Sequence, residues 1–371
     1  MLTRFMVLYA AMYAAYGVAS PFLPAFVNER GVPPEQLGVV LAAGTAIRLI
    51  AAPVAGRIGD LMQALRVVLV VCIALAAAVT LGYLPARGFW PFLVLTLLHA
   101  AFLAPMPVLA DALALGTSRV AKFEYGRVRG TGSAAFIAGI LLSGQLVGGF
   151  GLEAIIWSQA LLLAAAALAA TRVPEIPHVN ASRPEGALVL LRIPLFRNLV
   201  LVAALILGSH AMHDAFAVIR WTSAGVSPAT ASMLWSLAVL AEVVVFFAIG
   251  PALITRLTPA GAIALAALAG VVRWAVMAQT TGLIALALVQ PLHGITFALL
   301  HLACMRLIAR SVPQGLEGTA QALYATVGIG AATASLTLLS GFLYTRWGAD
   351  AFWVMAALCA AALPLTLKLR A

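Results

Sequence analysis

The chain has 371 residues, of which 64% are apolar and only 9% are charged, and its formal net charge is +10. An average soluble domain carries roughly 25% charged residues, so this chain cannot cover a water-exposed surface of its size. Soluble enzymes and soluble nucleic-acid-binding proteins are therefore excluded, and the composition indicates an integral membrane protein. Its apolar runs have the length of membrane-spanning helices, whereas a β-barrel would show alternating segments of about ten residues.

Apolar runs of about 20 residues predict twelve membrane-spanning helices. In chain order, these helices are expected over residues 5–27, 37–59, 67–84, 91–114, 128–148, 154–171, 198–220, 230–250, 259–279, 283–305, 318–343 and 350–367. The first run is too long for the apolar part of a cleavable signal peptide, and it lacks a small-residue cleavage site. Most connections are short, so consecutive helices are expected to run antiparallel.

One connection, over residues 172–197, is longer than the others and contains four prolines. We expect it to be a cytoplasmic linker that joins an N-terminal six-helix bundle over residues 1–171 to a C-terminal six-helix bundle over residues 198–371. Two six-helix halves with one long middle connection are similar to the plan of the major facilitator superfamily. The predicted fold class is therefore an all-α integral membrane protein with twelve transmembrane helices.

Lysine and arginine are distributed unequally between the two sides of the predicted membrane region. With the N-terminus in the cytoplasm, only Arg30, Arg87, Arg220 and Arg346 fall on the opposite side. Cytoplasmic loops of membrane proteins carry the excess of these residues, so both termini are expected in the cytoplasm. The positive charge thus has an explanation without a nucleic-acid partner, and we expect a monomer in a bacterial inner membrane.

Ionisable residues interrupt the apolar helices. They are the charged residues Arg48, Asp111, Arg129, Asp214, Glu242 and Arg273 and the histidines His99, His210, His213, His293 and His301. An isolated charge at the centre of a membrane helix costs about 2.5–3.5 kcal/mol, so these side chains should face a polar cavity or one another. The alternative is a set of buried ion pairs that only fix helix packing.

The depth of these residues in the membrane follows from the helical rise of 1.5 Å per residue. Arg48, Glu242 and His293 are expected about 15–18 Å from the ends of their helices, near the midplane. Asp111 and Arg129 lie on antiparallel neighbours at a similar depth, so we expect them to form a pair. Transporters of the superfamily bind their solute near the midplane, and this convergence therefore favours transport.

Two further patterns leave alternatives open. His210 and His213 share a helix face, as two metal ligands would. Without further histidine motifs, however, a polar pore lining or a proton relay is favoured over a metal site. Tyr9, Tyr13 and Tyr16 form one stripe on the first helix, either as an aromatic wall against the solute or as ordinary helix packing.

No cofactor or metal is expected. Cys72, Cys304 and Cys359 lie in apolar runs without paired spacing, which indicates neither a disulfide framework nor a zinc site. A nucleotide-binding loop of the Gly-x-x-x-x-Gly-Lys-Ser/Thr kind is absent from the sequence, so ATP-driven transport by this chain is not expected. A proton is the expected coupling ion.

Specific motifs resemble known transporters. Gly56, Asp60 and Arg66 resemble the loop motif of the major facilitator superfamily, which follows its second helix, although most of the basic residues expected after the aspartate are missing. The chain also resembles the 3-phenylpropionate transporter family over nearly its whole length. In chain order, that resemblance rests on Ala46-Ile47-Arg48, Pro105 to Asp111, Tyr125 to Arg129, Leu234 to Leu237, Ala241-Glu242, Gly270 to Trp274, His293-Gly294, His301 to Ala303 and Gly341 to Tyr344.

A more distant resemblance is to oligosaccharide–proton symporters of the lactose permease type. Asp111 and Arg129 are similar to the acid–arginine pair that binds sugar there, and Phe136 stands at the position of a sugar-stacking aromatic residue. Glu242, Arg273 and His293 fall on that family's residues for sugar contact and coupling. The resemblance therefore implies a solute site and a coupling site in this chain.

Two departures from that pattern affect the proton site. Thr296 stands where the lactose permease type has its proton-accepting glutamate, and His210 and His213 replace two aspartates. Glu242 is the best remaining acceptor, with His293 as its partner and Arg273 nearby. Asp214 with His210 is the reserve pair.

Together, these observations predict a secondary transporter that moves a small organic solute by alternating access. Uptake of an aromatic or other small carboxylate with protons is favoured, because Arg48 and Arg129 can hold a carboxylate by bidentate hydrogen bonds. A sugar–proton symporter and a drug or metabolite exporter are the alternatives, and a membrane enzyme is not expected. The predicted solute-binding residues are Tyr13, Arg48, Asp111, Arg129, Phe136 and Glu242, and the predicted coupling residues are His210, Asp214, Glu242, Arg273 and His293.

Overall fold

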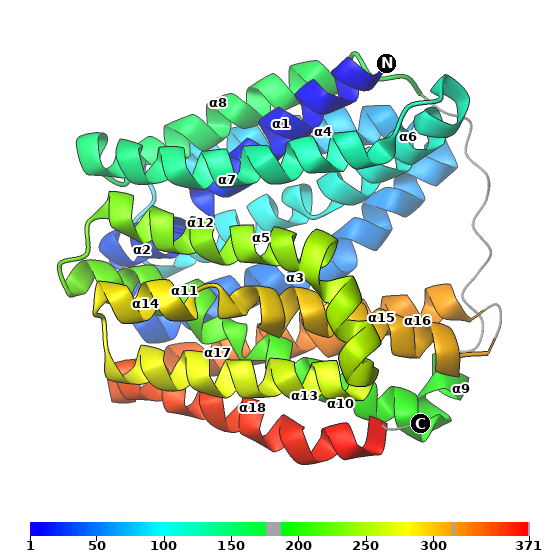
Figure 1. Cartoon of the computed structure of the whole chain (residues 1–371). Helices are drawn as coiled ribbons and strands as arrows, with labels where there is room; N and C mark the ends of the chain where they lie inside the picture. The colour runs from blue at the N-terminus through cyan, green and yellow to red at the C-terminus, as the bar shows by residue number, and fades with distance from the viewer. Residues whose placement is uncertain (176–186, 314–315, 370–371) are drawn as a thin grey trace. The chain divides into compact units, whose positions relative to one another are not determined.

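The computed structural model describes residues 1–175, 187–313 and 316–369, and helices make up almost all of this part of the chain (Figure 1). The chain divides into two compact units, Met1–Ala181 with Gly225–Met233 and Ser182–Ala224 with Leu234–Ala371. Residues 176–186 of the predicted linker lie outside the described residues. Each unit is described by itself below.

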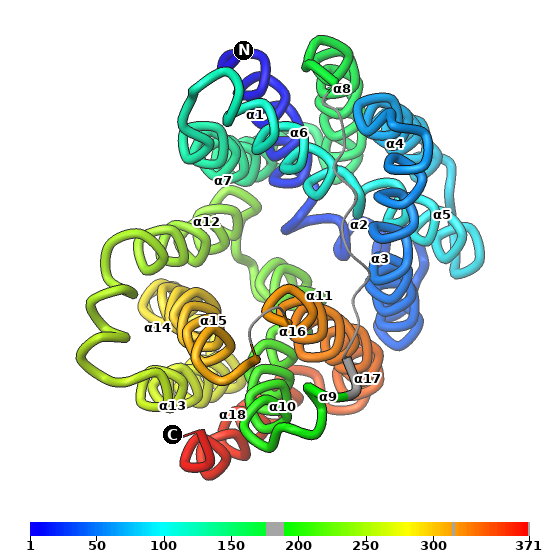
Figure 2. Tube along the Cα trace, turned by 90° about the vertical axis from the view of Figure 1, so that its right-hand side faces the viewer, coloured from blue at the N-terminus to red at the C-terminus, as the bar shows by residue number. Residues whose placement is uncertain are grey.

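The first unit is built from eight helices and the start of a ninth. The eight are α1 (Leu2–Ala19), α2 (Leu23–Glu29), α3 (Pro34–Met62), α4 (Leu65–Gly82), α5 (Phe89–Leu103), α6 (Pro105–Ala121), α7 (Tyr125–Phe150) and α8 (Glu153–Ala170). Figure 2 shows α1 beside α7 and α8, against which it packs, and α3 beside α5. The helix α1 is thereby positioned to present side chains to α6 and α7.

Glycines bring α1 and α7 into backbone contact. A Cβ atom at Gly17 would lie 2.2 Å from the carbonyl oxygen of Phe136, and one at Gly139 would lie 2.5 Å from that of Ala14. Side chains at these positions would push the helices apart, which is why small residues mark close helix packing in membranes. This close approach lets tyrosines on α1 reach charged side chains on its neighbours.

The second unit contains α-helices that are interrupted by π-helical turns (labelled η, as are the 3₁₀ turns η4 and η5). In chain order they are α9 (Ala187–Arg192), α10 (Pro194–Gly208), α11 (His210–Ser223), α12 (Pro228–Val244), η1 (Val245–Ile249), α13 (Gly250–Gln279), α14 (Leu283–Val289), η2 (Gly294–Leu299), α15 (Leu300–Ser311), α16 (Glu317–Leu323), η3 (Tyr324–Ala331), α17 (Ala332–Trp347), η4 (Gly348–Ala351), α18 (Phe352–Thr366) and η5 (Leu367–Leu369). The first six residues of α12 fall in the first unit. The π-helical turns are η1, η2 and η3.

The described residues contain ten helical segments that are long and apolar enough to cross a membrane. Two of them, Pro228–Gln279 and Glu317–Leu369, are long enough to cross twice. The first breaks at Thr258, which leaves the helical conformation because Pro259 follows it, and the second breaks at Gly348 with φ +51°. Twelve passes result, so the predicted twelve-helix fold class is confirmed.

Several predicted spans contain breaks that hydropathy did not indicate. The span expected over residues 91–114 is divided at Ala104, directly before Pro105, and the span expected over residues 198–220 is divided at Ser209. At the second break the hydroxyl of Ser209 donates to the carbonyl oxygen of Ile206 at 2.6 Å, which satisfies a backbone group there. This break places Ser209 and His210 among the polar residues of the second unit.

Candidate functional site

In the first unit, tyrosine hydroxyls hold a carboxylate and an arginine. The hydroxyl of Tyr9 donates to Oδ1 of Asp111, and the hydroxyl of Tyr125 donates to the same oxygen at 2.7 Å. Arg129 donates from Nη1 to the hydroxyl of Tyr13, and its guanidinium carbon lies 5.1 Å from the centre of that ring. The rings of Tyr9 and Tyr13 stack with centroids 5.7 Å apart, so the acid and the arginine are linked through tyrosines.

The structure does not place the predicted pair Asp111 and Arg129 in direct contact, but links the two residues through Tyr9 and Tyr13. Among the described residues, neither side chain forms a salt bridge, and each is bonded to tyrosines instead. The prediction rested on depth in the membrane, which does not fix the direction in which a side chain leaves its helix. Tyr9 and Tyr13 are four residues apart on one face of α1, so both hydroxyls reach this cluster.

The tyrosine stripe of α1 takes part in the polar cluster as well as in helix packing. Tyr9 is fully buried and Tyr13 is half-buried, and their hydroxyls bond Asp111 and Arg129. The third member, Tyr16, donates to the backbone carbonyl of Leu103 at 2.6 Å, which is a packing contact. The stripe thus supplies two residues to the polar cluster and one to helix packing.

Arg48 and Phe136 have different surroundings from this cluster. Arg48 lies in the middle of α3, is exposed, and makes no hydrogen bond or ion pair with any described residue. Phe136 is half-buried on α7, two helical turns after Arg129. The structure thus gives Arg48 the donor capacity to bind an anion.

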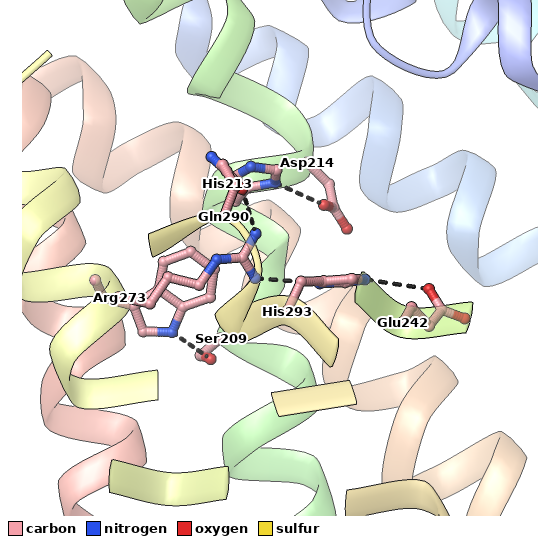
Figure 3. A network of polar contacts seen from close by, with 8 residues as sticks. Ser209, His213, Asp214, Glu242, Arg273, Gln290 and His293 are labelled. Atoms are coloured by element: carbon pink, nitrogen blue, oxygen red, sulfur yellow. Dashed lines mark hydrogen bonds and ion pairs between the residues drawn. The ribbon is translucent and has the colours of Figure 1, made fainter. Parts of the chain in front are cut away.

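The second unit contains a chain of hydrogen bonds centred on Arg273 (Figure 3). This arginine is completely buried; its Nη2 donates to Oε1 of Gln290 at 2.9 Å and its Nη1 lies 3.1 Å from Nδ1 of His293. On the other side of the imidazole, Nε2 lies 3.3 Å from Oε2 of Glu242. The guanidinium carbon also lies 4.5 Å from the ring centre of Trp274. The structure therefore brings the predicted partners Glu242, His293 and Arg273 together.

These contacts fix the tautomer of His293. A guanidinium group can only donate hydrogen bonds, so Nδ1 of His293 must accept from Arg273 and carry no proton. The proton of the neutral ring then lies on Nε2, where it is donated to the carboxylate of Glu242. A second proton on His293 would point an N–H group at Arg273, so protonating this imidazole breaks the chain of hydrogen bonds.

The two members of the reserve pair, Asp214 and His210, form no hydrogen bond or ion pair with each other among the described residues, and their coupling role remains a prediction. Asp214 instead lies 3.2 Å from Nδ1 of His213, its neighbour in sequence, and is 58% exposed. The ring of His210 packs against that of His293 with centroids 5.0 Å apart and against Trp274. His210 and Asp214 are four residues apart on α11, so they share a helix face, but the imidazole of His210 packs among aromatic rings while Asp214 contacts His213.

Several residues of these clusters were not among the predicted site residues. Gln290 and Ser209 in the second unit, and Tyr125 in the first, each bond a side chain of the clusters. Tyr9 does so as well, and it was predicted only as a member of the tyrosine stripe. Ser209 accepts from the indole nitrogen of Trp274 at 2.8 Å. The spacing offered a signal, because Tyr125 is four residues before Arg129 and Gln290 is three before His293.

Comparison with known proteins identifies the relatives of this chain. Residues 2–355 match the model of the "MFS_1 like family". The chain belongs to this family. It is 36% identical to the "Probable 3-phenylpropionic acid transporter" of Escherichia coli (strain K12) over 366 residues, which cover 95% of this chain and 94% of that protein. It is also 26% identical to the "Maltose permease" of Geobacillus stearothermophilus over 360 residues, covering 96% and 91% of the two chains.

Solved structures show the same fold. A mutant form of the nucleoside transporter NupG matches with a TM-score of 0.89 at 14% identity, and each chain is covered completely. The POT family transporter PepTSo matches with a TM-score of 0.74 at 12% identity, with 99% of this chain and 96% of that chain covered. This member of the MFS_1 like family is therefore a multi-pass membrane protein and a secondary transporter, not an enzyme.

The loop motif of Gly56, Asp60 and Arg66 links the connection between α3 and α4 to the segment that follows α8. Gly56 and Asp60 lie on the last turns of α3, and Arg66 lies on the first turn of α4. The backbone N–H of Arg66 donates to the carboxylate of Glu175 at 3.1 Å, and its side chain donates to the carbonyl oxygen of Val173 at 3.3 Å. The motif therefore fastens the α3–α4 loop to the segment after α8.

We expect Gly294→Ala to damage the contact between Glu242 and His293. A Cβ atom at Gly294 would lie 2.5 Å from the backbone oxygen of Ala241, so α12 and η2 would have to separate. Such overpacking costs about 1–3 kcal/mol, and thermal unfolding in detergent should show a lower midpoint together with weaker solute uptake. Gly318→Ala is the matched control, because nothing lies within 4 Å of a Cβ atom there. Equal stability and uptake of the two variants would contradict this expectation.

Proposed function

We propose that this transporter takes up a small organic carboxylate, preferably an aromatic one, together with protons. The observation that supports the solute class is the pair of arginines in the first unit, of which Arg48 makes no hydrogen bond or ion pair with any described residue. A guanidinium group binds a carboxylate by two parallel hydrogen bonds. The relative that is 36% identical is described as a probable transporter of 3-phenylpropionic acid, which is an aromatic carboxylate.

The residues proposed to contact the solute in the first unit have separate roles. Arg48 and Arg129 bind the carboxylate, and the rings of Tyr13 and Phe136 pack against the apolar part of the solute. Asp111 orients Arg129 indirectly, through the stacked rings of Tyr9 and Tyr13. In the second unit, we propose that Glu242 responds to the solute as well as to the proton.

The chain from Arg273 through His293 to Glu242 supports proton coupling. When Nε2 of His293 donates to the carboxylate of Glu242, the hydrogen bond is charge-assisted and about twice as strong as a neutral one. A proton on Glu242 weakens that bond, and a proton on His293 opposes Arg273. A proton on Glu242 or on His293 thus weakens the contact that holds α12 against η2. Protonation of this pair is therefore expected to allow the two helices to move apart.

The test is uptake by the purified protein in proteoliposomes with an imposed pH gradient. We expect 3-phenylpropionate to accumulate, its neutral amide to be transported poorly, and collapse of the gradient to stop accumulation. Equal transport of the carboxylate and the amide would exclude an anionic solute. Absence of pH-driven accumulation in the wild type would exclude proton coupling.

A sugar is the second candidate solute, favoured by the 26% identity to a maltose permease. The Asp111–Tyr9–Tyr13–Arg129 cluster offers both acceptors and donors, which suits hydroxyl groups. Maltose in the same proteoliposomes distinguishes the two candidates, because a sugar transporter would accumulate it in preference to 3-phenylpropionate.

We expect Arg48→Lys to weaken binding of a carboxylate although the charge is kept. The ammonium group of lysine lacks the planar fork that holds both carboxylate oxygens. Loss of one charge-assisted hydrogen bond corresponds to about 1.5–3 kcal/mol, or roughly a tenfold to hundredfold weaker affinity. Arg57→Lys on the same helix is the control, and a thermal-shift titration with 3-phenylpropionate is the measurement. If both variants bind equally well, Arg48 does not contact the solute.

We also propose the placement of the chain in the membrane. The unequal distribution of Lys and Arg supports termini in the cytoplasm of a bacterium, with a monomer as the working unit and residues 172–197 as the linker between two bundles. Reporter domains fused to either terminus should be active only when the reporter functions in the cytoplasm.

A further inference from the structure

In the second unit, a series of aromatic rings in contact with one another leads from His293 to His301. The ring of His293 stacks on Phe297 with centroids 5.5 Å apart, and Phe297 meets Phe246 edge to face at 6.5 Å. Phe246 in turn lies 6.0 Å from the ring of His301. His293, Phe297 and His301 follow one another at intervals of four residues, so they share one face of their helix.

A second polar cluster lies at the end of this series. The hydroxyl of Tyr324 lies 3.4 Å from Nδ1 of His301, and Cys304 lies one helical turn after His301 on the same helix. Tyr324 and Cys304 are buried, and His301 is half-buried. Neither the solute cluster nor the coupling pair uses this histidine.

Two phenylalanines separate His301 from the coupling pair. Eight residues of helical rise put His301 about 12 Å from His293, toward the end of α15 that carries Arg306 and Arg310. The rings of Phe246 and Phe297 offer no hydrogen-bonding group for a proton, and apolar constrictions of this kind exclude water. A proton on Glu242 therefore finds no hydrogen-bonding group on these two rings along the series that leads to His301.

The two phenylalanines that separate His301 from the Glu242–His293 pair form an apolar barrier, and both lie on π-helical turns. Phe246 belongs to the π-helical turn η1, Phe297 belongs to η2, and Tyr324 is the first residue of η3. Single π-helical turns inside α-helices are rare and are frequent at functional sites. A change of one residue in helical register rotates a side chain by about 100°, which is enough to move a phenyl ring out of the series.

We propose that His301, supported by Tyr324, is a second proton site that accepts the proton from the Glu242–His293 pair. This inference rests on the proposed proton coupling. When Phe246 and Phe297 move apart and water enters, the proton leaves Glu242, which returns to a carboxylate, and binds Nε2 of His301. The imidazolium then releases the proton to water at the Arg306 end. Tyr324 holds Nδ1, so that Nε2 is the nitrogen that gains and loses the proton.

The first experiment measures proton leak without solute, in proteoliposomes that contain a pH-sensitive dye and an imposed pH gradient. Phe246→Ala should leak protons at least about tenfold faster than the wild type, because the barrier is opened. Phe247→Ala is the matched control: it lies on the same turn but is 78% exposed, and should not leak. Adding His301→Gln to Phe246→Ala should return the leak to near the wild-type rate.

The second experiment measures solute transport by His301→Gln and Tyr324→Phe. His301→Gln should lower pH-driven accumulation at least about tenfold while solute exchange across the membrane continues, which also shows that the variant is folded. Tyr324→Phe keeps the ring and should cause a smaller loss of the same kind.

The outcomes separate this proposal from the proposed function. If the wild type accumulates solute and His301→Gln does so equally well, His301 is not a proton site, although proton coupling stands. If Phe246→Ala leaks just as fast with His301→Gln as without it, the proton bypasses His301 and the proposal is overturned. If Phe246→Ala does not leak, the phenylalanines are not the barrier. Failure of the proposed function appears in the wild type alone, as absence of pH-driven accumulation.

Discussion

Glu242→Gln should abolish pH-driven accumulation of the solute while solute exchange across the membrane continues. Glutamine keeps the shape of the side chain and can still accept a hydrogen bond from Nε2 of His293, but it cannot take up a proton. A positioned proton-transfer group contributes about a hundredfold or more, so the initial rate of pH-driven uptake should fall by about that factor. The measurement is parallel uptake and counterflow of labelled solute in proteoliposomes.

Glu35→Gln provides the control for this experiment, since Glu35 is exposed in the first turn of α3 and lies outside both clusters. Its uptake and exchange should match those of the wild type. If Glu242→Gln still accumulates solute in response to an imposed pH gradient, Glu242 is not the coupling group, and His293 with Arg273 would then have to be tested alone.

Neutralising either Asp111 or Arg129 should impair the protein more than neutralising both. Asp111→Asn leaves Arg129 without a nearby acid, and Arg129→Gln leaves the carboxylate without a nearby cation. Removing one partner of a fully buried pair costs about 3–5 kcal/mol. Because Asp111 and Arg129 are only half-buried and are linked through tyrosines without direct contact, we expect a smaller loss of stability, about 2 kcal/mol.

The double variant Asp111→Asn/Arg129→Gln should recover most of the thermal stability but not solute binding, because the carboxylate would lose Arg129. Thermal unfolding with and without 3-phenylpropionate reports both quantities. Normal transport by the double variant would mean that these residues only support helix packing. Tyr9→Phe removes one hydrogen bond to Asp111 and should show a smaller effect of the same kind.

Hydropathy and proline placement were enough to predict the helices. The breaks at Pro105 and Pro259 fall where a missing backbone N–H interrupts a helix, so they could also be located from the sequence. The π-helical turns could not, because they depend on how neighbouring helices pack. One of them follows His293 directly, so the exact direction of the coupling residues was not predictable either.

The sequence predicted most residues of the polar clusters, but it predicted fewer of the contacts between those residues. Depth in the membrane placed Glu242 and His293 at a similar level, and the resemblance to the lactose permease type paired them; they lie on helices in backbone contact at Gly294. Depth also paired Asp111 with Arg129, but tyrosines on a third helix take up their hydrogen bonds. Depth along a helix follows from residue number, whereas rotation around the helix axis depends on the packed structure.

The three cysteines of the chain, Cys72, Cys304 and Cys359, are buried free thiols. A polar maleimide or a spin-label reagent should therefore react slowly with the native protein. A cysteine introduced at an exposed position, such as Val120 at the end of α6, would become the fast-reacting site. Pairs of such labels would report inter-helix distances in the lipid bilayer without removal of the native thiols, so spectroscopic maps of the transport cycle can be made in an otherwise unaltered chain.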